Sequence, residues 1–164
     1  MKTQTIYKGL HRPFQLIPAC FRFFSRQKWF RIYREVIFTN TCKYILDNGD
    51  QEDWNKLFGF CFGIFGIHTN SARFAWRYSP DTGMIEIAVY CYQDGIRTYT
   101  TVSKIKIGEP VWLEIKRNYS TISFLVDLNC IHHITLASNK PAFGCGLYFG
   151  GNRRAPQNIT IKIQ

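Results

Sequence analysis

The stretch SARFAWRYSPDTGMIEIAVYCYQDGIRTY, residues 71–99, decides the fold. Apolar and polar side chains alternate along it, and a period of two is typical of strands that bury one face. If Ser79–Gly83 is the connecting loop, Trp76 lies opposite Ile87, and the neighbouring pairs on that face are also apolar. The sequence therefore predicts an antiparallel hairpin with one face in a hydrophobic core.

The other face of this hairpin carries charged and aromatic side chains. The same register places Arg73 opposite Tyr90 and Arg77 opposite Glu86. Because opposite charges on facing residues of an antiparallel pair attract each other, we expect Arg77 and Glu86 to form a cross-strand ion pair.

Asp94–Gly95 continues the sheet through a second, tighter turn. A two-residue type I′ turn needs positive φ at both central residues, and Asp and Gly tolerate this conformation. The turn pairs Cys91 with Thr98 on the core face and Tyr92 with Arg97 on the polar face. Three strands of one sheet are thereby predicted in register.

A third hairpin is predicted around a two-residue loop at Asn118–Tyr119. It would pair three apolar couples, which are Ile115 with Ile122, Leu113 with Phe124 and Val111 with Val126. Such a run of facing apolar residues indicates a second buried strand pair.

Other stretches complete an all-β pattern. Trp29–Phe38 alternates as a strand, and Ile159–Ile163 predicts a closing strand at the end of the sequence. Gly144–Gly151 is too rich in glycine for an uninterrupted strand. A short helix or 3₁₀ turn at Asp50–Lys56 is the only helical piece expected.

The composition suits one domain over residues 1–164. Aromatic residues make up 16% of the 164 residues, and large aromatic side chains favour half-buried pleated surfaces. Short strands joined by hairpins imply antiparallel sheets. We therefore predict an all-β fold, a two-sheet antiparallel β-sandwich of the jelly-roll kind.

Two segments resemble a known superfamily. Gly108–Ile115 runs from a glycine through Trp112 into a strand, and Ile122–Asp127 ends in Val-Asp. This pair, with Ser71–Arg77 and Ile85–Ile87 before it, is similar to strands of the concanavalin A-like (laminin G-like) jelly rolls, a superfamily of lectins and glucanases. The resemblance covers about half of the chain, and it implies glycan recognition or glycan cleavage.

Catalytic signatures of that superfamily are incomplete in this sequence. Its hydrolases use a Glu-x-Asp-x-x-Glu strand, whereas the only candidate strand here has Glu86 without the second and third acids. Its alginate lyases need a converging His, Tyr and Arg, and their Gln-x-His strand is missing. His68, in a glycine-rich loop, is expected to be structural or exposed to solvent.

The resemblance and the polar face together predict a glycan-binding surface. Its candidate residues are His68, Asn70, Arg73, Arg77, Glu86, Tyr90 and Tyr92. The expected function is that of a non-catalytic, lectin-like carbohydrate-binding domain, with an acidic glycan as a candidate ligand. A glycan-cleaving enzyme of the polysaccharide lyase or glycoside hydrolase type is an alternative.

The charge of the chain leaves a third function open. The formal net charge is +10, which attracts polyanions. In Phe21–Arg26 and Trp29–Arg34, basic residues alternate with aromatic ones, as in proteins that bind single-stranded nucleic acid. The sequence lacks recognisable nucleic-acid motifs, so this alternative ranks below glycan binding.

Cysteine and histidine positions predict no metal site and no cofactor. The six cysteines form no close pairs and lie mostly in apolar runs, so we expect them to be reduced and buried. His132 and His133 point to opposite faces of one strand. Without a visible signal peptide or membrane span, a cytoplasmic protein is expected, although a secreted protein lacking its leader would look the same.

Overall fold

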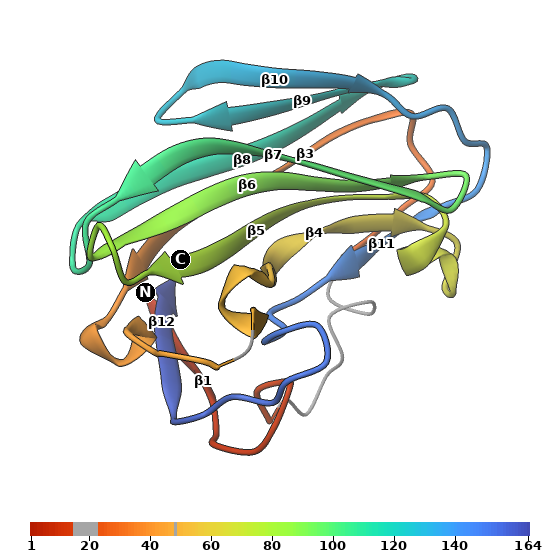
Figure 1. The fold of residues 1–164 in the computed structure, drawn as a ribbon. Coiled ribbons are helices and arrows are strands. Elements are labelled where there is room, and N and C mark those ends of the chain that lie inside the picture. Colours follow the sequence, from red (N-terminus) through yellow and green to blue (C-terminus); the bar gives the residue numbers. More distant parts are fainter. Residues whose placement is uncertain (15–22, 48) are drawn as a thin grey trace.

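The computed structural model describes residues 1–14, 23–47 and 49–164 (Figure 1). Two antiparallel sheets of six strands each form a β-sandwich, which confirms the predicted fold class. In spatial order, the first sheet contains β1 (Lys2–Ile6), β12 (Ile159–Ile163), β3 (Trp29–Phe38), β8 (Pro110–Asn118), β9 (Thr121–Val126) and β10 (Asn129–Thr135). The second contains β2 (Phe24–Ser25), β11 (Ala142–Cys145), β4 (Asn55–Phe62), β5 (Ser71–Ser79), β6 (Met84–Gln93) and β7 (Ile96–Ile105).

Helical structure is limited to short 3₁₀ turns in the described part of the chain. These are η1 (Asn40–Cys42), η2 (Asp50–Glu52) and η3 (Gly66–His68). The helical piece predicted over Asp50–Lys56 is therefore shorter than expected, because β4 already begins at Asn55. None of the described helices is long and apolar enough to cross a membrane.

The predicted pairing of β5, β6 and β7 is confirmed. Trp76 lies opposite Ile87, and the type I′ turn forms with φ of 50° at Asp94 and 84° at Gly95. Cys91 pairs with Thr98 as predicted, but Thr98 is exposed rather than in the core. Since β7 is the outermost strand of the second sheet, its first six residues are open to solvent.

The predicted register of the β8–β9 hairpin is wrong by two residues. The turn falls at Tyr119–Ser120, with Tyr119 at a φ of 55°, and Leu113 lies opposite Val126. A shift of two leaves every side chain on its predicted face, so the apolar pattern is the same in both registers. The incorrect pairs are Leu113 with Phe124, Ile115 with Ile122 and Val111 with Val126.

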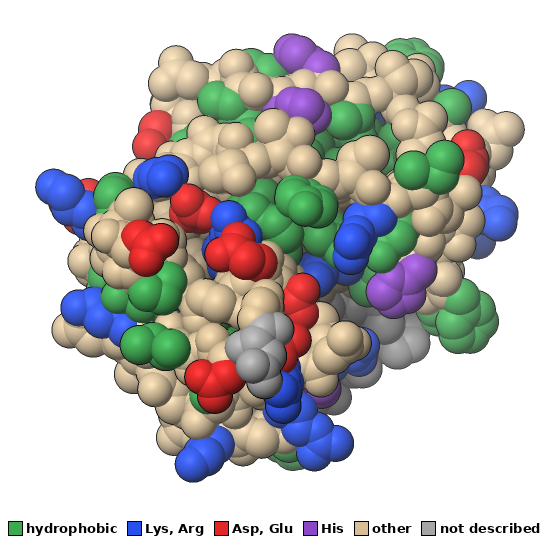
Figure 2. Space-filling view, in the orientation of Figure 1, with side chains coloured by type: hydrophobic (Ala, Val, Ile, Leu, Met, Phe, Trp, Pro, Cys, Tyr) green, Lys and Arg blue, Asp and Glu red, His purple; other side chains and the backbone are tan. Residues whose placement is uncertain are grey.

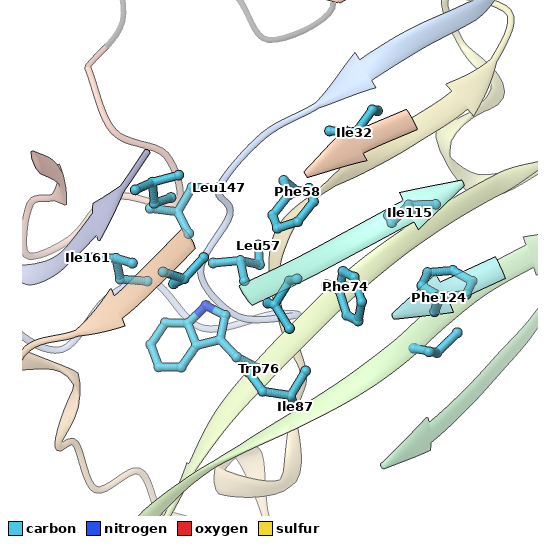
Figure 3. Packing of buried hydrophobic residues seen from close by; sticks show 14 of the residues in the cluster. Ile32, Leu57, Phe58, Phe74, Trp76, Ile87, Ile115, Phe124, Leu147 and Ile161 are labelled. Carbon is cyan, nitrogen blue, oxygen red and sulfur yellow. The ribbon is translucent and has the colours of Figure 1, made fainter. Parts of the chain in front are cut away.

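Large aromatic side chains fill the space between the two sheets (Figure 3). Phe74 on β5 meets Phe124 on β9 edge to face, with ring centroids 5.2 Å apart. The rings of Trp76 on β5 and Phe38 on β3 also pack together, with centroids 5.2 Å apart, so a second aromatic pair joins the sheets. The alternation read along β5 thus produces the core, and it turns the residues between these rings to the outer face.

Four described cysteines are buried, and one is not. Cys42, Cys61, Cys91 and Cys145 are buried and reduced, as predicted. Cys130 is exposed on β10, which contradicts the expectation for that residue. Cys20 lies outside the described residues.

Replacement of Phe124 by alanine should lower the free energy of unfolding by about 3–5 kcal/mol, because it opens a cavity at the contact between the sheets. Urea denaturation measures this change. Ile45→Ala, at a side chain that is 75% exposed, should change stability by less than about 0.5 kcal/mol. Equal effects of the two substitutions would contradict the described core.

Candidate functional site

The outer face of the second sheet carries most of the predicted site. Side chains that alternate away from the core place Arg73, Arg77, Glu86, Tyr90 and Tyr92 on this face. His68, in η3, and Asn70 lie beside it, in the connection between β4 and β5. In Figure 2, hydrophobic and basic side chains meet near the centre of the view, and most of the acidic ones lie below and to the left of them.

Arg73 is a buried cation at the centre of this face, with only 3% of its surface exposed. Arg73 lies opposite Gly59 on β4. A Cβ atom added at Gly59 would lie only 2.9 Å from Cγ of Arg73, so the glycine leaves room for the arginine side chain. Its guanidinium carbon lies 5.1 Å from the ring centroid of Tyr90 and 5.8 Å from that of Tyr92. Nη2 donates a long hydrogen bond of 3.5 Å to the Ile67 carbonyl, and Nε has no partner.

Lys56 brings a second cation to the same place. Its ammonium nitrogen lies 4.5 Å from the Tyr90 ring centroid and donates to the Trp54 carbonyl oxygen. The pKa of Lys56 is lowered to about 8, mainly because burial disfavours the ammonium form and also because the cations Arg73 and Arg97 lie nearby, while Asp53 opposes part of this shift. Cationic charge is thus concentrated around one tyrosine ring.

Tyrosine hydroxyls lie next to these cations. Burial raises the pKa of Tyr90, the hydroxyl of Tyr92 raises it further, and a hydrogen bond from Arg97 partly opposes both effects. The His68 ring meets the Tyr92 ring edge to face at 5.4 Å. Tyr92 is half-buried and His68 is exposed, so both reach the surface from which a ligand would approach.

Arg77 and Glu86 form the predicted cross-strand ion pair. Arg77 Nε donates to Glu86 Oε2 at 2.8 Å, and Arg77 also pairs with Glu52. Lys104 Nζ lies 3.1 Å from the other oxygen of Glu86. Burial disfavours the Glu86 anion, but its bonds with Arg77 and Lys104 outweigh this effect and lower its pKa.

Asn70 joins two loops at one end of the face. Its side-chain oxygen accepts a hydrogen bond of 3.1 Å from the Asp94 backbone N–H, and its amide donates to the Asp94 carboxylate at 3.4 Å. Asn70 therefore holds the β6–β7 turn in place. The structure brings His68, Arg73, Tyr90 and Tyr92 together, whereas Arg77 and Glu86 belong to a separate ion-pair network.

The sequence did not identify Lys56 as a site residue. β4 contains a bulge between Lys56 and Phe58 where it pairs with β5, and the backbone of Lys56 also bridges to Tyr148. A bulge changes the direction of a side chain without a clear signal in the hydrophobic pattern. Among the described residues, no group of three or more His, Cys, Asp or Glu side chains could hold a metal ion.

The buried amine of Lys56 should make stability depend on pH. Its pKa is about 8 in the folded chain against an ordinary 10.5, so the unfolded chain binds more protons between these values. The cost of burying the charge is present in full below pH 8, and stability from this group rises as pH increases from 8 to 10.5.

Lys56→Met should therefore raise the free energy of unfolding by about 1 kcal/mol at pH 7. This gain should shrink toward pH 10, where wild-type Lys56 folds uncharged. Urea denaturation of both proteins at the two pH values tests this, with the exposed Lys43→Met as the matched control. A difference that stays constant with pH would contradict the assignment.

The fold of this chain is similar to that of several solved structures. Neither a family model nor a curated protein matches the chain. An alginate lyase from Alteromonas sp. 272 superposes with a TM-score of 0.53 and 12% identity, over 90% of this chain and 76% of that one. A family 18 polysaccharide lyase superposes with a TM-score of 0.53 and 10% identity, over 90% of this chain and 76% of that one. A family 7 alginate lyase with bound product superposes with a TM-score of 0.57 and 10% identity, over 84% of this chain and 60% of that one.

These similarities confirm the concanavalin A-like jelly-roll fold. They also correct the functional expectation, because these structures, which share the fold over most of this chain, are polysaccharide-cleaving enzymes. The prediction of a non-catalytic, lectin-like domain is therefore wrong, and the alternative of a glycan-cleaving enzyme is the better supported one.

Proposed function

We propose that the protein is a polysaccharide lyase that acts on an acidic polysaccharide at the outer face of the second sheet. The observation that carries the proposal is the cluster of Lys56, Arg73 and Arg97 around Tyr90. The similarity to alginate lyases supports the same reaction class.

The cluster fits an anionic ligand because its charges repel one another. The positive charges of Arg73 and Arg97 add to the effect of burial and lower the pKa of Lys56, as expected for cations that repel one another. A carboxylate bound among them would relieve it, and the attraction would be strong because Arg73 is withdrawn from water. The carboxylate of a uronic acid unit has the required charge, and its sugar ring could lie against the half-buried ring of Tyr92.

Each residue can then be given a role in β-elimination. Arg97, exposed at the rim, pairs with the uronate carboxylate, while Arg73 below the tyrosine rings adds positive potential. The neutral amine of Lys56 takes the proton from C5, and the electron pair forms a double bond between C4 and C5. The bond from C4 to the glycosidic oxygen breaks, and the hydroxyl of Tyr92 protonates that oxygen.

Incubation with alginate or polygalacturonate should produce the ultraviolet absorbance of an unsaturated uronate. Lys56→Met should reduce the rate by at least about 100-fold, because the general base is lost. Lys43→Met, at an exposed lysine away from the face, should retain wild-type activity. Absence of new absorbance with both polymers would contradict the lyase proposal, and full activity of Lys56→Met would contradict the role of Lys56.

The pH profile of the reaction tests the base separately. Because only the neutral amine accepts a proton, kcat/KM should rise between pH 6 and 9, with its midpoint at about 8. The rates are measured at constant ionic strength, since salt weakens the attraction of the polymer. A rate that falls through this range would assign the base to another group.

A further inference from the structure

A thiol and an imidazole meet on the β9–β10 hairpin, at the edge of the first sheet opposite β1 (Figure 1). Cys130 Sγ lies 3.2 Å from His133 Nε2, and Ser123 Oγ lies 3.0 Å from His133 Nδ1. The side chain of Cys130 is exposed. None of these residues belongs to the candidate site on the second sheet.

A β-bulge brings Cys130 and His133 to the same face. Residues three apart on a regular strand point to opposite faces. Here the register shifts between Cys130 and His132, so that Cys130 lies opposite Leu125 and His133 lies opposite Ser123. Leu125 and Ser123 are two residues apart on β9 and share a face, and the bulge therefore aligns the thiol with the imidazole.

The hydrogen bond with Ser123 favours one tautomer of the His133 imidazole. When Ser123 Oγ accepts the hydrogen bond from Nδ1–H, the proton of the neutral ring is on Nδ1. Nε2 is then free to accept the thiol proton from Cys130 across 3.2 Å. The arrangement is that of a thiol nucleophile with its base and a positioning residue.

We propose that Cys130, His133 and Ser123 form a thiol-modification site that takes low-molecular-weight disulfides. His133 Nε2 accepts the proton of Cys130, and the thiolate attacks one sulfur of the disulfide. A bond forms between Cys130 Sγ and that sulfur, the original S–S bond breaks, and the departing thiolate takes the proton back from His133. The small disulfide is the oxidant, and the products are a mixed disulfide on Cys130 and one free thiol.

Anionic disulfides are the best-suited members of this class. The formal net charge of the chain is +10, which favours the approach of a negatively charged reagent. Glutathione disulfide carries net negative charge at neutral pH and is small enough for an exposed strand. The buried thiols of Cys42, Cys61, Cys91 and Cys145 are shielded from it.

Reduced protein incubated with glutathione disulfide at pH 7 tests the proposal. In a Cys20→Ser background, which removes the one cysteine outside the described residues, intact-mass measurement should show a single adduct, and peptide mapping should place it on Cys130. Cys130→Ser should abolish the adduct. His133→Gln should slow its formation about tenfold at pH 7 and move the rate profile to higher pH, because the base is lost while the exposed thiol remains.

His132→Gln is the matched control, because that ring lies on the other face near Phe124, with centroids 6.4 Å apart. It should react at the wild-type rate. Ser123→Ala should give an intermediate rate with the same adduct site. Modification of another cysteine in place of Cys130, or equal rates and pH profiles for wild type and His133→Gln, would overturn the proposal.

Discussion

Contact between Phe74 on β5 and Phe124 on β9 fixes the two sheets against each other. Because strand side chains alternate between faces, burial of Phe74 forces its neighbour Arg73 onto the outer face of the second sheet. The same constraint on β6 buries Val89 in the core and turns Tyr90 outward. Core packing and the position of the candidate site are therefore two results of one pattern.

On the outer face of the second sheet, two cations repel each other and are both attracted to one aromatic ring. Arg73 and Lys56 both lie against the ring of Tyr90, where contacts between cations and an aromatic face offset part of the cost of burial. The unpartnered Nε of Arg73 and the lowered pKa of Lys56 show that this compensation is incomplete. A fold that buries such cations without an ion pair loses stability, and in enzymes this loss is often tied to function.

Much of the fold follows from the sequence, but less of the site does. Alternation and the Asp94–Gly95 turn suffice for the register of β5 to β7, whereas the β8–β9 register is ambiguous because a shift of two preserves the apolar face. The bulge beside Lys56 and the one after Cys130 leave no clear hydrophobic signal, yet each places a reactive side chain. The ion pair of Arg77 with Glu86 was predictable because facing opposite charges can be read from register alone.

The central claim is that the Lys56, Arg73 and Arg97 cluster accepts the carboxylate of an acidic glycan. NMR titration of the Lys56 side chain, with and without a saturating uronate monosaccharide, which has no glycosidic bond to cleave, tests it most directly. The free protein should titrate at about 8, and a bound carboxylate should raise the midpoint by roughly one unit because an adjacent anion stabilises the ammonium form. An unchanged midpoint at saturation would contradict the account.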